Sequence, residues 1–314
     1  MAQGAGAARA LVEDLTMSGP GVEIDVALVS RLIAGQFPEW ADLPLRPVAS
    51  SGADNALFRP GEELVVRLPR VDWAAGMVAK EQRWLPRFSG RLPLDHPETR
   101  GLGEPASGYP WTWGVYQWLK GRDALADPVT NDVASARSLA GFLARMRGVE
   151  TLGGPAAGEA NNYRGVPLRQ LDRRVRESLA QLEADIDTAV AARIWNDALE
   201  AGAGDTPGRW VHGDLHPGNL LVRNGTLAGV LDFGSLGVGD PAVDLMAAWT
   251  VFGGDAREAF VEAAEMDREA WRRARGWALY GAAIALPYYR ERNPVLAAIS
   301  RRTLGEVLEG SGTV

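Results

Sequence analysis

The pattern of apolar residues changes near Gly121, and this change constrains the fold more than any other feature of the sequence. Before it, apolar runs are short and punctuated by glycine and proline, as in LRPVASSGADNALFRPGEELVVRLPR, residues 45–70. Such runs predict strands joined by turns, with a turn at PGEE, 60–63. A further β-rich run is WTWGVYQWL, 111–119. The first part of the chain therefore predicts a small sheet.

Two segments beside these runs are predicted to be helices. In DVALVSRLIAGQF, 25–37, apolar residues recur at helical spacing, with Asp25 as the expected N-cap and Pro38 as the stop. Residues 73–88 are expected to form a second helix that flanks the sheet. The sequence given starts with MAQGAGAARALVEDL, and we expect residues 1–24 to be a flexible leader.

After Gly121 the chain is predicted to be mostly helical. The segments 137–149 and 167–202 are amphipathic, and the second has one continuous apolar stripe. The stripe consists of Leu168, Leu171, Val175, Leu179, Leu182, Ile186 and Val190. With 314 residues the chain is long enough for two lobes that share a cleft. We predict an α+β fold with an N-lobe over 25–119, a small β-sheet with flanking helices, and a larger, mainly helical C-lobe over 120–314.

Composition excludes several classes of function. Hydrophobic residues make up 46% and charged residues 23%, as in an ordinary globular protein. The net charge of −7 argues against nucleic acid as a partner, because backbone binding needs a concentrated basic face. Without cysteine there is no disulfide, thiolate metal site or cysteine nucleophile. No apolar run approaches the roughly 18 residues of a membrane span, so we expect a cytoplasmic protein with no membrane partner.

A polar cluster lies between two apolar runs in VHGDLHPGNLLV, residues 211–222. His212, Asp214, Leu215 and Asn219 match the kinase catalytic-loop spacing H-x-D-L-x-x-x-N, with glycine where protein kinases have arginine. Further along is the tripeptide D-F-G, residues 232–234. Either motif alone is common in polar turns. Both together, in this order and each after an apolar run, predict phosphoryl transfer.

Phosphoryl transfer depends on positioning and on cations that neutralise the phosphates, which assigns a role to each polar residue. Asp232 and Asn219 are expected to hold Mg²⁺. Asp214 is expected to be the catalytic base that accepts the proton of the attacking hydroxyl. His212 is expected to brace the loop rather than transfer a proton, with Asp244 as a candidate partner for it.

A kinase also needs a cation on the nucleotide phosphates, commonly a lysine on the third strand. The chain has only Lys80 and Lys120, and neither is on a predicted strand of the sheet. Arg67 in LVVRLPR takes the matching place, and its guanidinium can bridge phosphate oxygens. The alternative is a surface charge on an edge strand. Three acids lie within reach in sequence as its partner: Glu81, Glu98 and Glu104. We expect Glu81.

Two further segments are predicted to contact the nucleotide. SSGADN, 50–55, is the expected phosphate-covering loop, with contacts from Ser51, Gly52 and Asn55, although a plain hairpin turn would have the same composition. GVYQWLKG, 114–121, comes where the two lobes join. There the main chain of Gln117 and Leu119 is expected to hold the purine.

Together these motifs resemble the aminoglycoside phosphotransferase family, the small-molecule branch of the protein-kinase-like fold, over about residues 25–310. The resemblance implies a bilobal fold, ATP or GTP as donor, Mg²⁺ as cofactor and a small-molecule hydroxyl as acceptor. After D-F-G, residues 235–249 run directly into a helix and leave no room for the activation loop of a protein kinase. In this family the acceptor lies over the helical lobe, where Trp249, Glu262 and Tyr280 are candidate contacts. For the aromatic residues, core packing is the alternative.

The expected activity is Mg²⁺-dependent transfer of a nucleotide γ-phosphate to a hydroxyl of an antibiotic-like natural product, of aminoglycoside, macrolide or nucleoside type. Such a change would confer resistance. One alternative is a metabolic kinase that acts on an amino alcohol, homoserine or a sugar. Another is a nucleotide-binding pseudokinase with a regulatory role. We expect a monomer or a homodimer.

Overall fold

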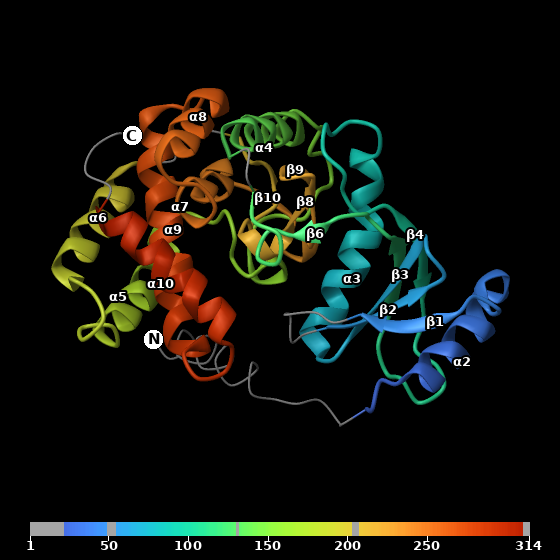
Figure 1. Ribbon diagram of the computed structural model, residues 1–314. Coiled ribbons are helices and arrows are strands. Elements are labelled where there is room, and N and C mark those ends of the chain that lie inside the picture. Colours follow the sequence, from blue (N-terminus) through green and yellow to red (C-terminus); the bar gives the residue numbers. More distant parts are fainter. Residues whose placement is uncertain (1–21, 49–54, 130–131, 203–206, 310–314) are drawn as a thin grey trace. The chain divides into compact units, whose positions relative to one another are not determined.

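The computed structural model describes residues 22–48, 55–129, 132–202 and 207–309, and these form two compact units (Figure 1). The first comprises Met1–Pro86 and Pro97–Trp118, and the second comprises Arg87–His96 and Leu119–Val314, each within its described residues. Residues 87–96 belong to the second unit because they join its sheet. Val230 N–H donates to the carbonyl of Asp95 at 2.8 Å, and Asp95 N–H donates to the carbonyl of Ala228 at 3.0 Å.

The first unit is built on one five-stranded sheet with the order β1-β2-β3-β5-β4, in which each neighbouring pair is antiparallel. Its strands are β1 (Leu45–Val48), β2 (Asn55–Pro60), β3 (Leu64–Pro69), β4 (Thr99–Gly103) and β5 (Trp113–Gln117). Burial alternates along β3, where Val66 is buried and Arg67 is only partly so. Because side chains alternate across a strand, Val66 and Arg67 point to opposite faces.

Two helices accompany this sheet. Helix α2 (Val26–Gln36) packs its buried Leu32 and Ile33 into the core formed with Val66, and Asp25 Oδ1 accepts a hydrogen bond from Leu28 N–H at 2.7 Å. The predicted helix and its N-cap are therefore confirmed. Helix α3 (Asp72–Trp84) packs against β3 and β5 and continues as a 3₁₀ turn over Leu85–Phe88.

In the second unit, short strands hold the polar motif. Strands β7 (Arg209–Val211) and β10 (Gly237–Gly239) pair antiparallel, and β6 (Arg122–Asp123) pairs with a hairpin of β8 (Leu220–Arg223) and β9 (Thr226–Val230). The hairpin turn Asn224–Gly225 has φ values of 52° and 73°. Positive φ at both central residues is what a two-residue hairpin turn of type I′ requires, and Asn-Gly is a preferred sequence for it.

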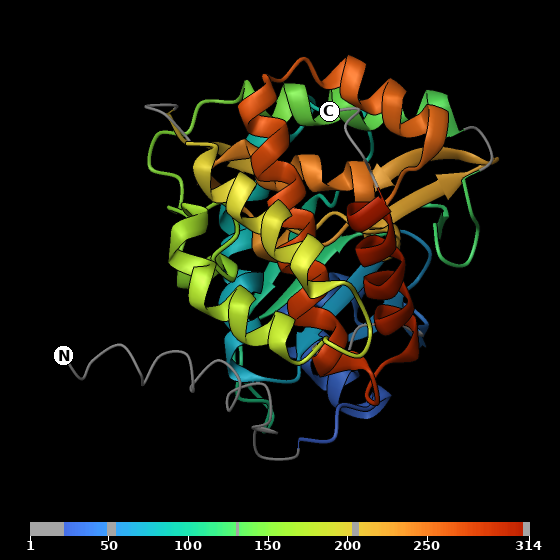
Figure 2. The same ribbon diagram turned by 90° about the vertical axis from the view of Figure 1, so that its left-hand side faces the viewer.

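Helices form the rest of the second unit: α4 (Asp132–Arg147), α5 (Asp172–Ala180), α6 (Thr188–Glu200), α7 (Ala247–Thr250), α8 (Gly254–Ala264), α9 (Arg268–Tyr289) and α10 (Pro294–Glu309). Figure 2 shows α5 and α6 along one side of α9, and α10 along another. Among the described residues no helix combines the length and apolar character needed to span a bilayer.

The predicted continuous stripe over residues 168–190 is wrong. Helix α5 ends at Ala180, turns follow, and α6 begins at Thr188. The chain restarts a helix here because the carboxylate of Asp187 caps it, accepting a hydrogen bond from Val190 N–H at 3.0 Å. Leu182 is buried in the connection, whereas Ile186 and Val190 are only half-buried.

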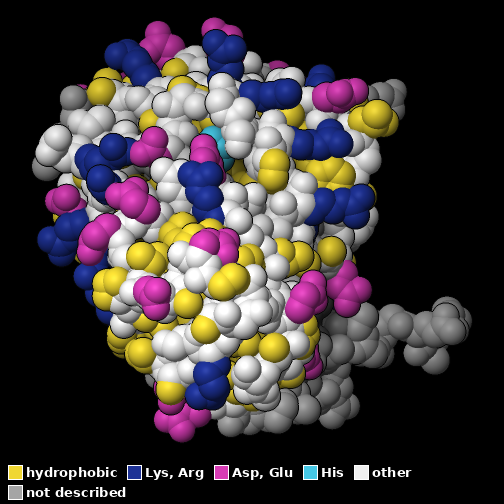
Figure 3. Space-filling model, turned by 90° about the vertical axis from the view of Figure 1, so that its right-hand side faces the viewer, with side chains coloured by type: hydrophobic (Ala, Val, Ile, Leu, Met, Phe, Trp, Pro, Cys, Tyr) yellow, Lys and Arg dark blue, Asp and Glu magenta, His cyan; other side chains and the backbone are white. Residues whose placement is uncertain are grey.

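Charged side chains of both signs are exposed on one face of the protein. On the face shown in Figure 3, Lys and Arg side chains lie among Asp and Glu side chains rather than in one continuous patch.

Candidate active site

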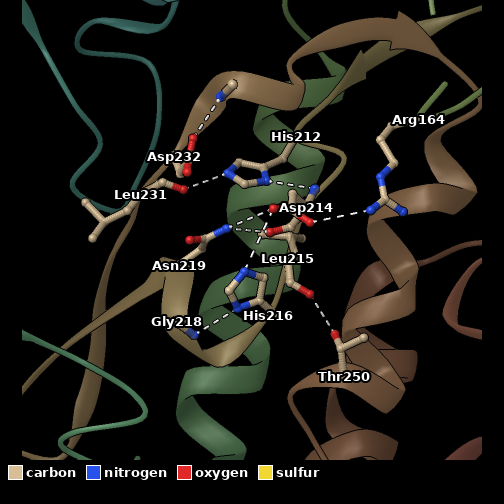
Figure 4. Close-up of polar contacts among 11 residues, drawn as sticks. Arg164, His212, Asp214, Leu215, His216, Gly218, Asn219, Leu231, Asp232 and Thr250 are labelled. Atoms are coloured by element: carbon tan, nitrogen blue, oxygen red, sulfur yellow. Dashed lines mark hydrogen bonds and ion pairs between the residues drawn. The ribbon is translucent and has the colours of Figure 1, made fainter. Parts of the chain in front are cut away.

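The polar motif forms a loop that leaves β7 at Val211 and enters β8 at Leu220 (Figure 4). A 3₁₀ turn over Pro217–Asn219 closes it. The hydroxyl of Thr250 donates to the carbonyl of Leu215 at 2.7 Å and anchors the loop to α7. The side chain of Asp214 remains 36% exposed, so a substrate can reach its carboxylate.

Asp244 fixes the start of this loop. Its two carboxylate oxygens accept hydrogen bonds from the backbone N–H groups of His212, at 2.8 Å, and Gly213, at 2.7 Å. Burial raises the pKa of the Asp244 carboxyl, and the two N–H donors and the charge of Arg147 act in the opposite direction. The predicted partnership with His212 therefore exists, but it involves the backbone rather than the imidazole.

The imidazole of His212 is fully buried and both of its nitrogens are used. Nε2 lies 2.9 Å from the carbonyl oxygen of Leu231, and Nδ1 accepts a hydrogen bond from Asp214 N–H at 3.2 Å. These partners assign the proton to Nε2. The ring also packs edge-on against Phe233, with centroids 4.8 Å apart. This placement suits a brace between the two motifs, as the sequence predicts.

Of the two predicted metal ligands, Asn219 directly precedes strand β8 and Asp232 follows strand β9 after one residue. Asn219 Nδ2 donates to the backbone carbonyl of Asp214 at 2.9 Å and to Asp214 Oδ2 at 3.3 Å. The backbone carbonyl of Asn219 accepts a hydrogen bond from Leu231 N–H at 2.8 Å. Asp232 has φ 57° and ψ 79°, and its Oδ1 accepts Gly234 N–H at 3.2 Å. A non-glycine residue in this conformation costs about 1–3 kcal/mol, and such strain concentrates at functional sites.

These ligands fit Mg²⁺ only if phosphate completes its shell. A carboxylate and an amide are oxygen donors that Mg²⁺ accepts, and the ion commonly takes one or two carboxylates plus substrate phosphates. Within the described ranges, no group of three or more His, Asp or Glu side chains is placed to hold a metal. A carboxylate and an amide are thus a donor set that a cation bound together with nucleotide phosphates could use.

Two basic side chains beside Asp214 were not assigned to it by the sequence analysis. Arg164 places Nη2 at 3.7 Å from Asp214 Oδ1, and His216 places Nε2 at 3.8 Å from Oδ2 (Figure 4). His216 is two residues from Asp214 inside the motif, so its position was a usable signal. Arg164 comes from a distant loop, where Asn162 and Tyr163 both have positive φ, and no local pattern marks it.

Arg164 also explains why position 213 is glycine. Gly213 has φ +83°, and a Cβ atom there would lie 2.8 Å from the Cβ of Arg164 and 2.9 Å from the carbonyl oxygen of Ser235. A side chain at this position is therefore excluded both by conformation and by space. The motif lacks the arginine of protein kinases here, and a guanidinium from another segment lies beside the aspartate instead.

In the first unit, the predicted pair Arg67–Glu81 is confirmed. Arg67 Nη1 donates to both carboxylate oxygens of Glu81, at 2.9 and 3.0 Å, and Glu81 is 1% exposed. The hydroxyl of Tyr116 donates to Glu81 Oε2 at 2.8 Å. Burial and the neighbouring Glu81 raise the pKa of Tyr116 well above its ordinary value. Arg67 is thus held on the sheet face opposite Val66.

The two alternative acids have other partners. Glu98 forms an exposed ion pair with Arg100, and the backbone of Glu104 exchanges hydrogen bonds with the side chain of Gln36. Neither competes with Glu81 for Arg67.

Of the main-chain groups predicted to contact the purine, the N–H of Gln117 already has a hydrogen-bond partner in the protein. Gln117 N–H donates to the carbonyl of Glu98 at 2.9 Å, and Trp118 N–H donates to the carbonyl of Glu63 at 2.7 Å. These N–H groups are used by the first unit itself, because β5 continues to pair at this point. Leu119 follows directly and keeps its predicted role as a proposal.

The remaining predicted nucleotide contacts belong to the phosphate loop. Ser51 and Gly52 lie outside the described residues. Asn55 is the first residue of β2 and pairs with Pro69.

The three predicted acceptor contacts are dispersed. Trp249 is buried and packs edge-on against Trp271, so it belongs to the core. Glu262 lies on α8 with a side chain 78% exposed and pairs with Arg137 at 3.6 Å. Tyr280 is buried, and the guanidinium carbon of Arg164 lies 5.7 Å from its ring centroid. Of the three, only Tyr280 is linked to Asp214, through Arg164.

A comparison with protein families is decisive once this geometry is known. The model described as "Phosphotransferase enzyme family" matches residues 45–277, which include Arg67, Glu81 and all of the polar motif. The chain belongs to this phosphotransferase enzyme family. The family resemblance predicted from the motifs is therefore confirmed.

Two curated proteins are similar in sequence to this phosphotransferase. Homoserine kinase of Beijerinckia indica subsp. indica is 29% identical over 164 residues, 49% of this chain and 48% of that protein. The uncharacterised protein YcbJ of Bacillus subtilis (strain 168) is 28% identical over 161 residues, 48% of this chain and 47% of that one. The chain thus spans about half the length of the curated relatives it matches.

Solved structures show the fold of the phosphotransferase. The wild-type aminoglycoside 2′-phosphotransferase-IIIa, in a GDP complex, is similar with a TM-score of 0.70 and 18% identity over 91% of this chain and 99% of that one. Macrolide 2′-phosphotransferase type I is similar with a TM-score of 0.59 and 21% identity over 90% and 98%. At these identities the likeness confirms the predicted α+β, protein-kinase-like fold class.

Proposed function

We propose that this phosphotransferase moves the γ-phosphate of ATP or GTP to a hydroxyl of a small molecule, with Mg²⁺ as cofactor. One observation carries the proposal. The imidazole of His212 binds both the backbone N–H of Asp214 and the carbonyl of Leu231, which directly precedes Asp232. A base and a metal ligand are thereby held by one buried ring, an arrangement that a simple polar turn does not need.

In the proposed reaction Asp214 accepts the proton of the acceptor hydroxyl. The hydroxyl oxygen forms a bond to the γ-phosphorus while the bond between that phosphorus and the β–γ bridging oxygen breaks, which releases the nucleoside diphosphate. Asn219 supports this step by donating Nδ2 to Asp214 Oδ2. The contact limits the rotation of the carboxylate and keeps it directed at the acceptor.

Asn219 and Asp232 are the residues proposed to hold Mg²⁺. Bound there with the nucleotide, the ion would neutralise charge that develops on the phosphate oxygens. In the other unit, Arg67 is proposed to bind the phosphates as a substitute for the usual lysine. Glu81 and Tyr116 keep its guanidinium in one orientation. The main chain of Leu119 and the segment with Ser51, Gly52 and Asn55 complete the proposed nucleotide contacts.

Two classes of acceptor enter the proposal. An antibiotic-like acceptor, with resistance as the outcome, is supported by the family resemblance and by neighbours named for aminoglycosides and macrolides. A metabolic hydroxyl compound is supported by a relative named homoserine kinase. A pseudokinase is disfavoured because Asp214, Asn219 and Asp232 are all present. The proposal places the reaction in the cytoplasm, where nucleoside triphosphates are available, with the protein as a monomer or homodimer.

The direct test is transfer from γ-labelled ATP and GTP to a panel of acceptors. The panel contains aminoglycosides, macrolides, nucleoside antibiotics, amino alcohols, hydroxy amino acids and sugars, and labelled phosphate on the acceptor is the readout. We expect Mg²⁺-dependent labelling of one class, and its loss in Asp232→Ala. Growth of a sensitive host that expresses the chain tests resistance separately. Binding of Mg²⁺-nucleotide without transfer to any acceptor would instead favour the pseudokinase.

A further inference from the structure

Two arginines converge on the ring of Tyr280 in the second unit. The guanidinium carbon of Arg164 lies 5.7 Å and that of Arg174 6.0 Å from the ring centroid, and Arg174 Nη1 donates to the Tyr280 hydroxyl at 3.4 Å. They come from separate elements: Arg164 from the loop that follows the 3₁₀ turn Glu159–Asn161, and Arg174 from α5. Arg164 Nη2 is also 3.7 Å from Asp214 Oδ1. Positive charge therefore gathers directly beside the proposed base.

Among the described residues, the guanidinium of Arg164 has an ion-pair partner but no hydrogen-bond partner. Its distance to Asp214 exceeds that of a hydrogen bond, and its Nε and Nη1 atoms are buried without a partner among the described residues. Polar atoms of a cation that are buried without a hydrogen-bond partner are costly, and an aromatic ring compensates only part of that cost. Two donor groups of Arg164 therefore have no acceptor among the described residues.

Another arginine of the same unit shows what full pairing looks like. Arg273 on α9 is buried and donates through Nε and Nη2 to the two carboxylate oxygens of Asp240, at 2.7 and 3.3 Å. Arg174 has no such carboxylate: within the described part of the chain its contacts are with Tyr280 alone. The chain thus supplies two hydrogen-bonded carboxylate oxygens for Arg273, whereas Asp214, the carboxylate that pairs with Arg164, lies 3.7 Å from its Nη2.

We infer that Arg164, assisted by Arg174, binds an acidic group of the acceptor, and that the acceptor is a hydroxy acid. This inference rests on the proposed function. In this arrangement Asp214 binds the reacting hydroxyl of the acceptor molecule and Arg164 binds its carboxylate. Arg164 Nη2 and Asp214 Oδ1 are 3.7 Å apart, and one hydrogen-bond length is added at each end. The hydroxyl and the carboxylate of the acceptor molecule can therefore be no more than about 10 Å apart. A short acid such as homoserine meets this limit. Two guanidiniums disfavour a polycationic aminoglycoside at the same place.

The test compares acids with their uncharged counterparts. Hydroxy acids with two to four bonds between hydroxyl-bearing carbon and carboxylate, homoserine among them, are each measured beside their primary amide as acceptors. The full chain is used as wild type, Arg164→Met, Arg164→Lys and the control Arg173→Met. Arg173 lies on α5 next to Arg174, and its side chain is 61% exposed and pairs with Glu177. Binding of each compound in the presence of Mg²⁺-ADP is measured in parallel by calorimetry.

For wild type we expect the acid to exceed its amide in kcat/KM by roughly 10–100-fold, as for a charge-assisted pair. Arg164→Met should abolish this preference, mainly through KM, while Arg164→Lys restores part of it and Arg173→Met changes nothing. Equal losses for acid and amide would overturn the inference, because Arg164 would then act on Asp214 or on the phosphate. A preference for amides or for aminoglycosides would overturn it as well.

Calorimetry separates this inference from the proposed function. Arg164-dependent binding of acids without any transfer would contradict the phosphotransferase activity and leave the anion site supported. Transfer to an acceptor whose binding does not depend on its acid group would support the phosphotransferase activity and contradict the anion site.

Discussion

The imidazole of His212 lies 2.9 Å, through Nε2, from the carbonyl oxygen of Leu231. This contact links the loop of Asp214 to the segment that carries Asp232. In His212→Ala the carbonyl loses its partner and a buried cavity forms, so we expect a loss of about 2–4 kcal/mol in the free energy of unfolding. We also expect kcat to fall at least tenfold. Urea titration measures the change in stability and steady-state kinetics measures kcat. A normal kcat in a destabilised variant would show that the His212 ring contributes to core packing but not to catalysis.

Arg67 tests the cation of the first unit. Arg67→Lys keeps the charge next to Glu81 but loses the planar fork, so we expect nucleotide affinity to fall by about 3–10-fold. Arg46→Lys is the matched control, since Arg46 forms an exposed ion pair with Glu62. Fluorescence titration with a labelled nucleotide measures both. Equal affinity in the two variants would remove Arg67 from the nucleotide site.

Tyr116 gives the first unit a defined dependence on pH. Its folded-state pKa is raised above that of the unfolded chain, chiefly by burial and then by Glu81. The stabilising effect of the neutral hydroxyl is therefore fully present below about pH 10 and is lost as pH rises toward the folded-state pKa. The difference in free energy of unfolding between wild type and Tyr116→Phe should be constant from pH 7 to 9 and shrink above pH 10. A difference that grew with alkaline pH would contradict the burial of a neutral Tyr116.

Gly213 is predicted to be intolerant of any side chain. Gly213→Ala forces a Cβ against Arg164 and Ser235 at positive φ, so we expect lower stability and a displaced Asp214, with kcat reduced more than nucleotide binding. Gly141 on α4 is the control, because a Cβ there would meet no atom of the described residues within 4 Å. Gly141→Ala should stabilise the protein by about 0.5–1 kcal/mol. Thermal unfolding and turnover distinguish the two substitutions.

The parts of the site that the sequence predicts are those with a local signal. Strand β3 and helix α3 follow one another, so the pairing of Arg67 with Glu81 could be predicted from their order. The loop from His212 to Asn219 has a motif spacing. Arg164 has neither, because a loop conformation with two left-handed residues brings it to Asp214 from far away in the chain.

One prediction was wrong and another was only partly right because a single local interaction decided the structure. The apolar stripe over residues 168–190 suggested one helix, but the cap at Asp187 starts a second one. Asp244 was identified as a partner of His212, yet burial beside two backbone N–H groups directs its carboxylate to the main chain. Neither interaction alters the hydrophobic pattern, so neither is visible in it.

Asp214 carries the central claim, and Asp214→Asn tests it most directly. The substitution keeps the size of the side chain and removes the proton acceptor, so we expect phosphate transfer to fall by about 10²–10⁴-fold. Mg²⁺-nucleotide binding should stay within about twofold, because Arg67, Asn219 and Asp232 are untouched. Rapid-quench measurement of labelled phosphate on the acceptor gives the transfer rate without product release. Transfer at the wild-type rate in Asp214→Asn would contradict the account.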